Sequence, residues 1–186
     1  MRNTIILISI LIIFLLLKSC TKKDNNGFWV FKIKEGKHRS TNKIKYICKN
    51  SLNFDLMLTE SCKYQSKSLE NQYDVNKIFG ISDEGGHMEN SARVGWRYLN
   101  DKIELMAFIH NNGVFSFEKI CDAEPNVVYN CNINLLDDKY EFIINNNIII
   151  MDRYKNNKRC KYLLYPYFGG DELAPHDIEI KIKLNK

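Results

Sequence analysis

The sequence lacks the short motifs that identify several common classes of enzyme and metal protein. It contains no Cys-x-x-Cys, no His-Glu-x-x-His, no Gly-x-Ser-x-Gly, and no glycine pattern of a Walker loop or a dinucleotide-binding fold. His87-Met88-Glu89 matches the His-x-Glu of zinc deaminases, but no Pro-Cys-x-x-Cys follows it. These absences argue against structural zinc, thioredoxin-like redox chemistry, zinc peptidase or deaminase activity, and serine hydrolysis.

A strong charge imbalance is also missing. The formal net charge is +5, and without residues 1–19 the chain carries 25 Lys and Arg against 22 Asp and Glu. Both signs are scattered along the sequence, so we expect no nucleic-acid partner. Proline is scarce, with three residues, and no amphipathic helical pattern extends beyond about two turns. The composition therefore favours one domain built from strands.

The N-terminus has the order of a secretory signal. Arg2 precedes an apolar run over residues 5–17 that only Ser9 interrupts. The run has about 13 residues, fewer than the ~20 that a helix needs to span the hydrocarbon core of a bilayer. The segment Leu17-Lys18-Ser19-Cys20 that closes it resembles the lipobox of bacterial lipoproteins.

The lipobox resemblance implies that Cys20 is acylated and becomes the new N-terminus. Residues 1–19 would then be a signal peptide, residues 20–27 a flexible lipid-anchored tether, and residues 28–186 one folded domain. Lys22-Lys23-Asp24 resembles the surface-export signal of lipoproteins of the Bacteroidetes group. We therefore expect a membrane-anchored protein of the cell envelope, at the outer membrane or the cell surface. An uncleaved signal anchor is the alternative.

Five cysteines remain if Cys20 carries lipid, so at least one thiol must stay unpaired. An exported domain permits disulfides. The closest pairs in sequence are Cys48 with Cys62 and Cys121 with Cys131. The alternative is that these cysteines are small buried apolar side chains on strands.

Short apolar runs with turn signals between them follow from residue 28 onward. The clearest is residues 178–184, where Ile178, Ile180, Ile182 and Leu184 alternate with charged residues, which places one face in a core and the other in water. Residues 63–77 are polar and predict a loop with one helical turn at most. The pattern predicts an all-β fold, an antiparallel β-sandwich of the jelly-roll or concanavalin-like type.

The first candidate site is the glycine-rich loop and strand over residues 85–97. We select His87, Glu89, Arg93 and Arg97 as ligand-binding candidates. Arg93 and Arg97 share one strand face, opposite Ala92, Val94 and Trp96, and Gly95 between them would open a slot for a flat ligand such as a sugar ring. An arginine can grip a carboxylate or sulfate through two hydrogen bonds. The alternative is that both arginines pair with acids on neighbouring strands.

The second candidate site is the segment over residues 162–177, an irregular loop whose backbone is fixed by prolines and a glycine pair. The candidates here are Tyr167, Asp171, His176 and Asp177. Asp171, Glu172 and Asp177 can together supply oxygens for calcium, although they lack EF-hand spacing. The alternative is a structural loop whose acids cap turns and whose aromatic residues cover the core.

The phrases FGISDEGGHMENSARVGWR and YPYFGGDELAPHDIEI resemble small jelly-roll-type lipoproteins of the Bacteroidetes group. The resemblance carries no established activity. At the level of fold, the expected sandwich is similar to the concanavalin-like sandwiches of glycan lectins and polysaccharide lyases, and fold alone does not fix function.

Three functional hypotheses follow. The first is an exported lipoprotein that binds a glycan or another cell-envelope component without catalysis, with no cofactor or with calcium. The second is a polysaccharide lyase, in which Arg93 or Arg97 neutralises a uronate while His87, His176 or a tyrosine exchanges protons. The third is a structural component of a surface protein complex.

The aromatic side chains available for ligand stacking or core packing are Trp96, Tyr98, Tyr167 and Phe168.

Overall fold

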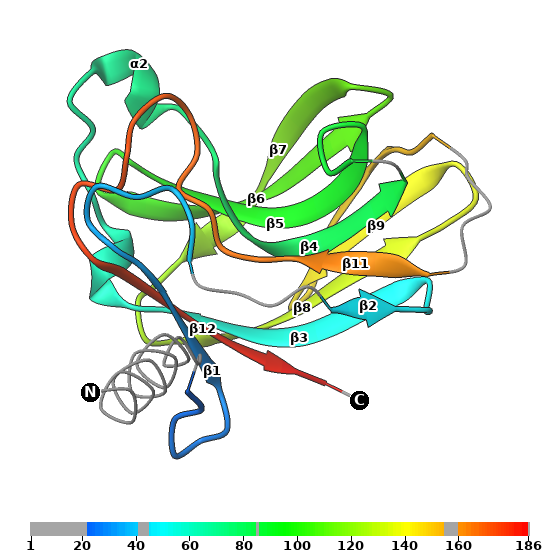
Figure 1. The fold of residues 1–186 in the computed structure, drawn as a ribbon, viewed down its shortest axis with the longest axis horizontal. Coiled ribbons are helices and arrows are strands. Elements are labelled where there is room, and N and C mark those ends of the chain that lie inside the picture. The colour runs from blue at the N-terminus through cyan, green and yellow to red at the C-terminus, as the bar shows by residue number, and fades with distance from the viewer. Residues whose placement is uncertain (1–21, 41–44, 85, 155–159, 186) are drawn as a thin grey trace, which may run out of the picture.

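The computed structural model describes residues 22–40, 45–84, 86–154 and 160–185, and nearly all of its regular structure is β (Figure 1). The strands are β1 (Trp29–Ile33), β2 (Tyr46–Ile47), β3 (Ser51–Leu58), β4 (Asn76–Glu84), β5 (Asn90–Leu99), β6 (Lys102–Asn111), β7 (Val114–Ala123), β8 (Val128–Leu135), β9 (Lys139–Ile144), β10 (Asn147–Asp152), β11 (Lys161–Leu164) and β12 (Ile178–Leu184). The two helical elements are η1 (Glu60–Cys62) and α2 (Leu69–Gln72). In this described part of the chain, no helix is long and apolar enough to cross a bilayer.

The strands form two six-stranded sheets. Sheet A has the order β1-β12-β3-β8-β9-β10, and sheet B has the order β2-β11-β4-β5-β6-β7. Every pairing between neighbouring strands is antiparallel. The prediction of an all-β antiparallel sandwich is therefore confirmed.

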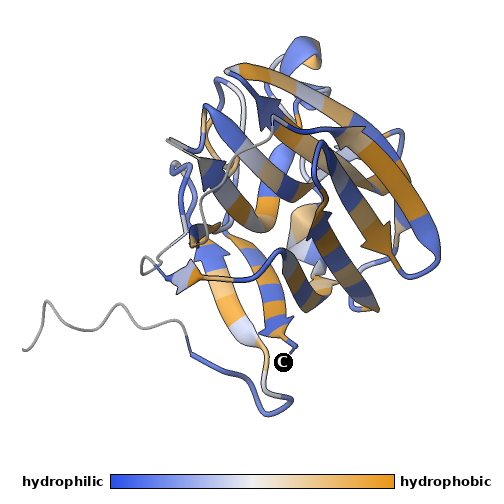
Figure 2. Cartoon of the chain, turned by 90° about the vertical axis from the view of Figure 1, so that its right-hand side faces the viewer, coloured by the Kyte–Doolittle hydropathy of each residue, from blue (hydrophilic) through white to orange (hydrophobic). Residues whose placement is uncertain are grey.

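The core lies between the two sheets and is built mainly from alternate residues of the strands. Figure 2 shows the hydrophilic and hydrophobic residues alternating along the strands. On β12, Ile178, Ile180 and Ile182 are buried, as the alternation predicts. Trp96 of β5 is also fully buried, and its indole N–H donates to the Cys62 carbonyl at 3.2 Å. The inward face of β12 thus follows the period of two in the sequence, whereas β4 departs from it at a register shift, where Ile78 and Phe79 are both in the core.

Strand β4 extends beyond the apolar run of its sequence. The run Ile78-Phe79-Gly80-Ile81 is followed by Asp83 and Glu84, and both acidic residues still belong to the strand. Asp83 has no exposed side-chain surface, because it pairs with Arg153 at 2.5 Å and accepts the Tyr140 hydroxyl at 3.0 Å. An acidic residue in the sequence usually indicates an exposed position, and only its partners on distant strands explain why Asp83 is buried.

The Asp83 pair forms a polar brace between the two sheets. Asp83 belongs to β4 of sheet B, and Tyr140 belongs to β9 of sheet A. The Arg153 guanidinium donates to both carboxylate oxygens of Asp83, at 2.5 and 3.2 Å. The Lys161 ammonium lies 3.9 Å from the same carboxylate. The brace therefore satisfies its buried charges with partners of opposite sign.

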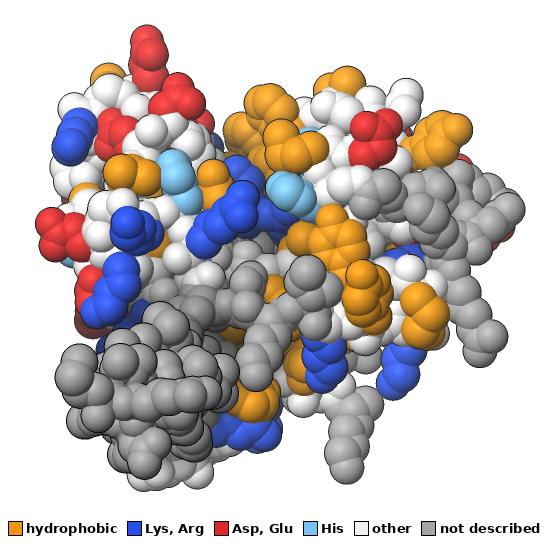
Figure 3. All heavy atoms as spheres, in the orientation of Figure 1, with side chains coloured by type: hydrophobic (Ala, Val, Ile, Leu, Met, Phe, Trp, Pro, Cys, Tyr) orange, Lys and Arg blue, Asp and Glu red, His pale blue; other side chains and the backbone are white. Residues whose placement is uncertain are grey.

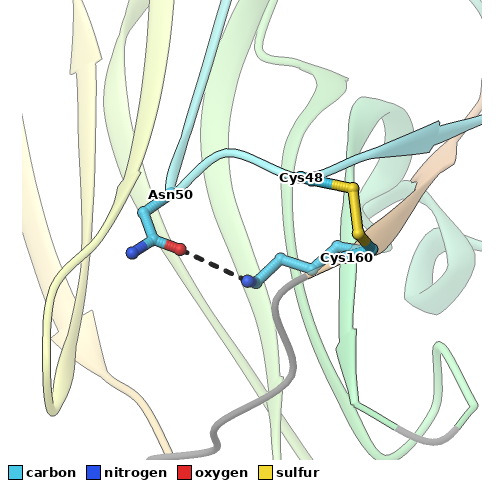
Figure 4. Close-up of a disulfide and its surroundings, with 4 residues drawn as sticks. Cys48, Asn50 and Cys160 are labelled. Atoms are coloured by element: carbon cyan, nitrogen blue, oxygen red, sulfur yellow. Dashed lines mark hydrogen bonds between the residues drawn. A yellow bond between two sulfur atoms is a disulfide. The ribbon is translucent and has the colours of Figure 1, made fainter.

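The disulfide joins neither of the two cysteine pairs that are closest in sequence, and the alternative of buried unpaired thiols holds for Cys62 and Cys131. The structure joins Cys48 to Cys160, which are 112 residues apart in sequence (Figure 4). Cys48 follows β2 and Cys160 precedes β11, and these two strands are neighbours in sheet B. Cys62 and Cys131 are instead buried thiols, and Cys121 is a half-buried thiol. Neighbourhood in a sheet decided the pairing, and sequence separation did not predict it.

The chain ahead of β1 is ordered where the sequence suggested a flexible tether. Residues 22–28 turn back along β1, with an antiparallel bridge between Lys23 and Trp29 and a hydrogen bond from the Val30 N–H to the Lys22 carbonyl at 2.9 Å. The predicted signal peptide and Cys20 lie outside the described residues.

Candidate functional site

A cleft of about 780 Å³ opens on the outer face of sheet B. In Figure 3, basic and histidine side chains gather in the middle of this face, hydrophobic side chains lie over β7, and acidic side chains lie toward α2. The residues that line it come from β4 to β7, from α2 and from four loops. They are Arg39, Glu70, Asn71, Asp74, Val75, Lys77, His87, Met88, Arg93, Phe108, His110, Phe115, Phe117, Tyr167, Gly170 and Asp171.

The alternation of β5 and β6 selects which side chains reach the cleft. Ala92, Val94 and Trp96 point into the core, so Arg93 points out from the same strand. Arg93 pairs in register with Phe108 of the neighbouring strand β6. His110 therefore lies on the same face as Arg93, two residues further along β6, where diagonal neighbours are close enough for long side chains to meet.

An aromatic wall borders the cleft on the side of β7. Phe108 lies opposite Phe117, and its ring is nearly parallel to the rings of Phe115 and Phe117, with centroids 6.1 and 6.4 Å away. Phe115 and Phe117 remain 60% and 41% exposed. Large apolar rings are usually buried, so parallel exposed rings beside a polar cleft form a surface on which a flat, partly apolar ligand can stack.

Arg93 is the most buried cation in the cleft, with 6% of its surface exposed. It forms no ion pair or hydrogen bond with any described residue, and its buried Nε atom has no acceptor. Burial lowers the pKa of Arg93 to about 10, while two nearby tyrosines, Tyr162 and Tyr167, oppose that shift. The guanidinium still carries its charge at neutral pH and has donor capacity that the described protein does not use.

Lys77 adds a second cation beside Arg93. Its ammonium lies 4.3 Å from the centroid of the Phe108 ring, a cation–π contact. Burial and the Arg93 charge together lower the pKa of Lys77 to about 8, against the attraction of Asp74. The Lys77 ammonium is therefore close to its titration point at mildly alkaline pH.

The two histidines of the cleft are held toward the neutral form. Burial, together with the charges of Arg93, Lys77 and His87, lowers the pKa of His110 to about 4. Its Nδ1 atom lies 3.3 Å from the Ser91 hydroxyl, which donates to the His87 carbonyl at 2.7 Å. Burial and the charges of Arg93 and Arg39 also lower the pKa of His87. His110 is an uncharged imidazole at neutral pH.

The loop between β11 and β12 forms one border of the cleft. Tyr167 exchanges two backbone hydrogen bonds of 2.8 Å with Lys77, and its ring stacks on His38 with centroids 5.2 Å apart. Gly169 allows this approach, because a Cβ atom there would lie 2.7 Å from the Lys77 Nζ atom. Gly170 has a positive φ of 73°, and its backbone rests against the Asp74 carboxylate. The glycine pair is therefore required by the close contact of the loop with β4.

The structure brings four of the predicted ligand-binding residues together. His87 and Arg93 from the first candidate site and Tyr167 and Asp171 from the second all line the cleft. Two segments about 70 residues apart in sequence thus contribute to one face, although they were predicted as separate sites.

The other four predicted residues lie elsewhere. Arg97 donates to Glu104 of β6 at 2.6 Å, so for this arginine the alternative of a structural ion pair holds. His176 bonds the Ser61 carbonyl at 2.8 Å, and Asp177 pairs with Lys34 at 2.5 Å. Glu89 is exposed and does not line the cleft. These side chains have partners of their own or point away from the cleft.

The slot predicted over Gly95 is closed. A Cβ atom at Gly95 would lie 2.6 Å from both the Val75 side chain and the Asn76 carbonyl oxygen, so the preceding strand and loop already fill this space. Val75 packs there with Met106 and Phe108 in a small apolar cluster. Gly95 is needed for close packing of chain segments, and the ligand space lies beside Arg93.

The three acids considered for calcium do not converge. Glu172 accepts hydrogen bonds from the backbone N–H groups of Lys67 and Ser68, and Asp177 pairs with Lys34, whereas Asp171 lines the cleft. Among the described residues, no group of three or more His, Cys, Asp or Glu side chains is arranged to hold a metal ion.

Several aromatic candidates belong to the core. Trp96 and Phe168 are buried, and Tyr98 packs against the core, so only Tyr167 of the four reaches the cleft. The residues that sequence reasoning missed are Arg39, Lys77, Phe108, His110, Phe115 and Phe117. The alternation of β6 already placed Phe108 and His110 opposite the apolar Ala107 and Ile109, which is the signal that could have found them. Lys77, in a polar segment, gave no such signal.

Comparison with known proteins supports the fold. No family model matches the sequence, and no curated protein matches it. Among solved structures, the alginate lyase AlyC3 superposes with a TM-score of 0.64 and 13% identity, over 87% of this chain and 75% of that chain. The Bacteroides ovatus mixed-linkage glucan GH16 protein superposes with a TM-score of 0.55 and 7% identity, over 88% and 83%. At such identities the likeness establishes a shared β-sandwich fold.

Proposed function

We propose that the cleft of sheet B binds an acidic saccharide through Arg93. The observation that carries the proposal is a guanidinium that is 6% exposed and has no acidic or hydrogen-bonding partner among the described residues. Burying a charge without a partner costs stability, so such a group is usually retained for an interaction with something else. A carboxylate or sulfate fits the planar donors of an arginine and would compensate that cost.

The surroundings of Arg93 favour a sugar over a simple anion. Lys77 adds a second positive charge, and the exposed rings of Phe115 and Phe117 provide a stacking surface next to it. A saccharide ring has an apolar face formed by its C–H groups, while its carboxylate and hydroxyl groups lie at the edge. A volume of about 780 Å³ is within the range of ligand sites and accommodates more than one sugar ring.

The solved structures of the same fold include complexes with saccharides. AlyC3 is described in complex with dimannuronate, with a TM-score of 0.59, and the GH16 protein in complex with a G4G4G3G product. Dimannuronate carries carboxylates, the group that Arg93 is suited to bind. These complexes support the choice of a glycan as the ligand class.

A polysaccharide lyase is the second candidate, and His110 is the observation that favours it. The lyase hypothesis requires an arginine and proton-transfer groups on one concave face, and Arg93, His87, His110 and Tyr167 all line the cleft. In such a reaction the arginine neutralises the uronate carboxylate, a base removes the proton on C5, and an acid protonates the O4 atom as the C4–O4 bond breaks. An uncharged His110 imidazole is in the form of a base at neutral pH.

We further propose that acylation of Cys20 anchors the domain at the cell envelope, on the outer membrane or the cell surface. Support comes from the lipobox-like Leu17-Lys18-Ser19-Cys20 and from the disulfide Cys48–Cys160, which suits an oxidising compartment. Two or more acyl chains give stable attachment where one gives marginal binding. The mass of the intact mature protein reports acylation and removal of residues 1–19.

Calorimetric titration with oligosaccharides separates the binding hypotheses. We expect oligouronates to bind and neutral glucans of equal length to bind at least tenfold more weakly, because only the former offer a carboxylate to Arg93. Arg93→Met should abolish this preference, and Lys102→Met, which removes an exposed charge outside the cleft, should keep it. Equal affinity for neutral and acidic sugars would refute the role of Arg93.

The same oligouronates test for catalysis. Elimination creates a C4–C5 double bond, which absorbs ultraviolet light, so product formation can be followed directly. Growth of this absorbance that disappears in His110→Phe would establish the lyase, and binding without any absorbance change would assign the cleft to binding alone.

A further inference from the structure

A short hairpin at the start of the described chain lies beside the residue proposed to carry the lipid. Lys22 is two residues from Cys20 in the sequence. Since a chain extends by at most about 3.6 Å per residue, the Cα atom of Lys22 cannot lie more than roughly 7 Å from that of Cys20. Lys22, the first residue of the hairpin, therefore stays within about one Debye length of a membrane that holds the acyl chains.

The hairpin is joined firmly to the domain. Asp24 fixes its turn by accepting from the backbone N–H groups of Asn26 and Phe28, both at 3.0 Å. The Lys181 ammonium on β12 donates to the other oxygen of Asp24 at 3.3 Å. Together with the bridge between Lys23 and Trp29, these bonds leave no flexible segment between residue 22 and β1. An anchor at Cys20 thus constrains the orientation of the sandwich.

The surface around the hairpin is basic and aromatic. Lys22, Lys23 and Lys183 are exposed, and none of them forms an ion pair with a described residue. Trp29 is 38% exposed, with the Lys23 ammonium 4.9 Å from its ring centroid, and the Lys183 ammonium lies 5.7 Å from the ring centroid of Phe28. The one acid of the hairpin, Asp24, is already paired with Lys181.

We propose that this hairpin surface docks the domain on the anionic phospholipid headgroups of the membrane in which Cys20 is acylated. The inference rests on the proposed acylation of Cys20. Each lysine held near an anionic leaflet favours the docked state by about fivefold. Tryptophan, with an apolar body and a polar N–H, is suited to the interface between headgroups and acyl chains. Trp29 is placed to enter that interface between the lysines.

Docking through the hairpin sets the position of the cleft. β1 is an edge strand of sheet A, whereas the cleft lies on the outer face of sheet B. In Figure 1 the hairpin projects from the end of the molecule that is opposite to α2, which borders the cleft. The membrane would therefore contact the edge of sheet A and leave the cleft open to glycans outside.

Fluorescence of Trp29 in vesicles tests the docking. The full chain is produced in a bacterium that acylates lipoproteins, its mass is measured, and it is reconstituted with lipids brominated near the headgroup. Trp96 is fully buried and gives a constant background, which Trp29→Phe measures separately. We expect quenching of Trp29 to be stronger in vesicles that contain phosphatidylglycerol than in pure phosphatidylcholine.

Lys183→Glu provides the decisive variant, because residue 183 is remote in sequence from the processing site. It should lower the ratio of docked to undocked protein by about fivefold or more. Lys67→Glu, an equal charge change near α2, should leave the ratio unchanged. Acylated protein whose Trp29 is not quenched, or is quenched equally in both lipids, overturns the docking and leaves the anchor standing. A mass without acyl groups overturns the anchor and the docking together.

Discussion

Two buried arginines of this molecule have opposite surroundings. The Arg153 side chain is 7% exposed and gives two hydrogen bonds to the Asp83 carboxylate, which has no exposed side-chain surface. Arg93 is buried to a similar degree on the other face of sheet B, without an acid and with an unused Nε donor. One charge is satisfied by the fold, and the other has no partner within the described chain.

The difference separates a structural from a functional role. A buried ion pair is strongly destabilised when one partner is removed, because the remaining charge stays buried alone. A buried charge without a partner already carries this cost in the folded protein. Removing it should therefore not lower the stability of the fold, and should weaken only the binding of a ligand that pairs with it. Burial does not distinguish the two arginines. The presence of an acidic partner for Arg153, and its absence for Arg93 among the described residues, does.

Loss of Asp83 should have the largest effect on stability. Asp83→Ala leaves Arg153 and Lys161 without the buried carboxylate, so we expect the free energy of unfolding to fall by about 3–5 kcal/mol. Denaturation by urea measures the change. Asp152→Asn breaks the exposed pair with Lys139 and should leave the free energy of unfolding almost unchanged, because solvent screens exposed ion pairs. Equal losses in the two variants would remove the distinction between a brace and a surface pair.

Arg93→Met should produce the reverse pattern. The free energy of unfolding should stay constant or rise, because methionine keeps apolar volume and removes an unpaired buried charge. Affinity for an oligouronate should fall by about 10- to 100-fold, the worth of one charged hydrogen-bonding group. Urea denaturation and calorimetry on the same sample check both parts. A destabilised Arg93→Met protein would mean that Arg93 braces the fold as Arg153 does.

The pH dependence of stability tests the burial of Lys77 and His110, the titratable groups beside Arg93 in the cleft. The pKa of Lys77 is about 8 in the folded chain and 10.5 for an ordinary lysine, so between these values the unfolded chain binds the extra proton. Stability should therefore rise with pH across that window, and Lys77→Met should flatten the rise. His110, with a pKa of about 4, gives the same sign between pH 4 and 6.5, so stability is lost there on acidification.

The pair of Arg97 with Glu104 should give the smallest effect. Glu104 is buried, but Lys119 also contacts it at 2.7 Å, so the carboxylate keeps a cationic partner when Arg97 is removed. Arg97→Met should lower the free energy of unfolding by about 1 kcal/mol or less. Oligouronate affinity should stay unchanged, because Arg97 does not line the cleft. A loss of affinity comparable with that of Arg93→Met would show that the ligand extends beyond the cleft.

The sequence predicted the fold well where one strand carries the information. The alternation of Ala92, Val94 and Trp96 with Arg93 placed the arginine on the outer face, and the structure confirms that placement. A period of two is a property of a single strand, so it can be seen without knowing the neighbours.

Relations between strands were much harder to predict. The approach of Tyr167 to Lys77 and the pairing of Cys48 with Cys160 depend on the strand order of sheet B, which no local pattern encodes. Gly95 shows the same limit, because the missing side chain suggested an open space that Val75 fills. The site was therefore predicted as separate candidates, and the sheet topology unites half of their residues.

The staple between Cys48 and Cys160 has a consequence for how the chain matures. β2 contributes only two residues to the edge of sheet B and pairs with β11 alone. So few backbone pairs between β2 and β11 contribute little stability, and the disulfide that links the two strands keeps them in register. Until oxidation, β2 should fray and leave the backbone of β11 open to solvent. Completion of this sheet edge therefore depends on oxidation of the two thiols, and a chain whose thiols stay reduced keeps a looser edge at β2 and β11.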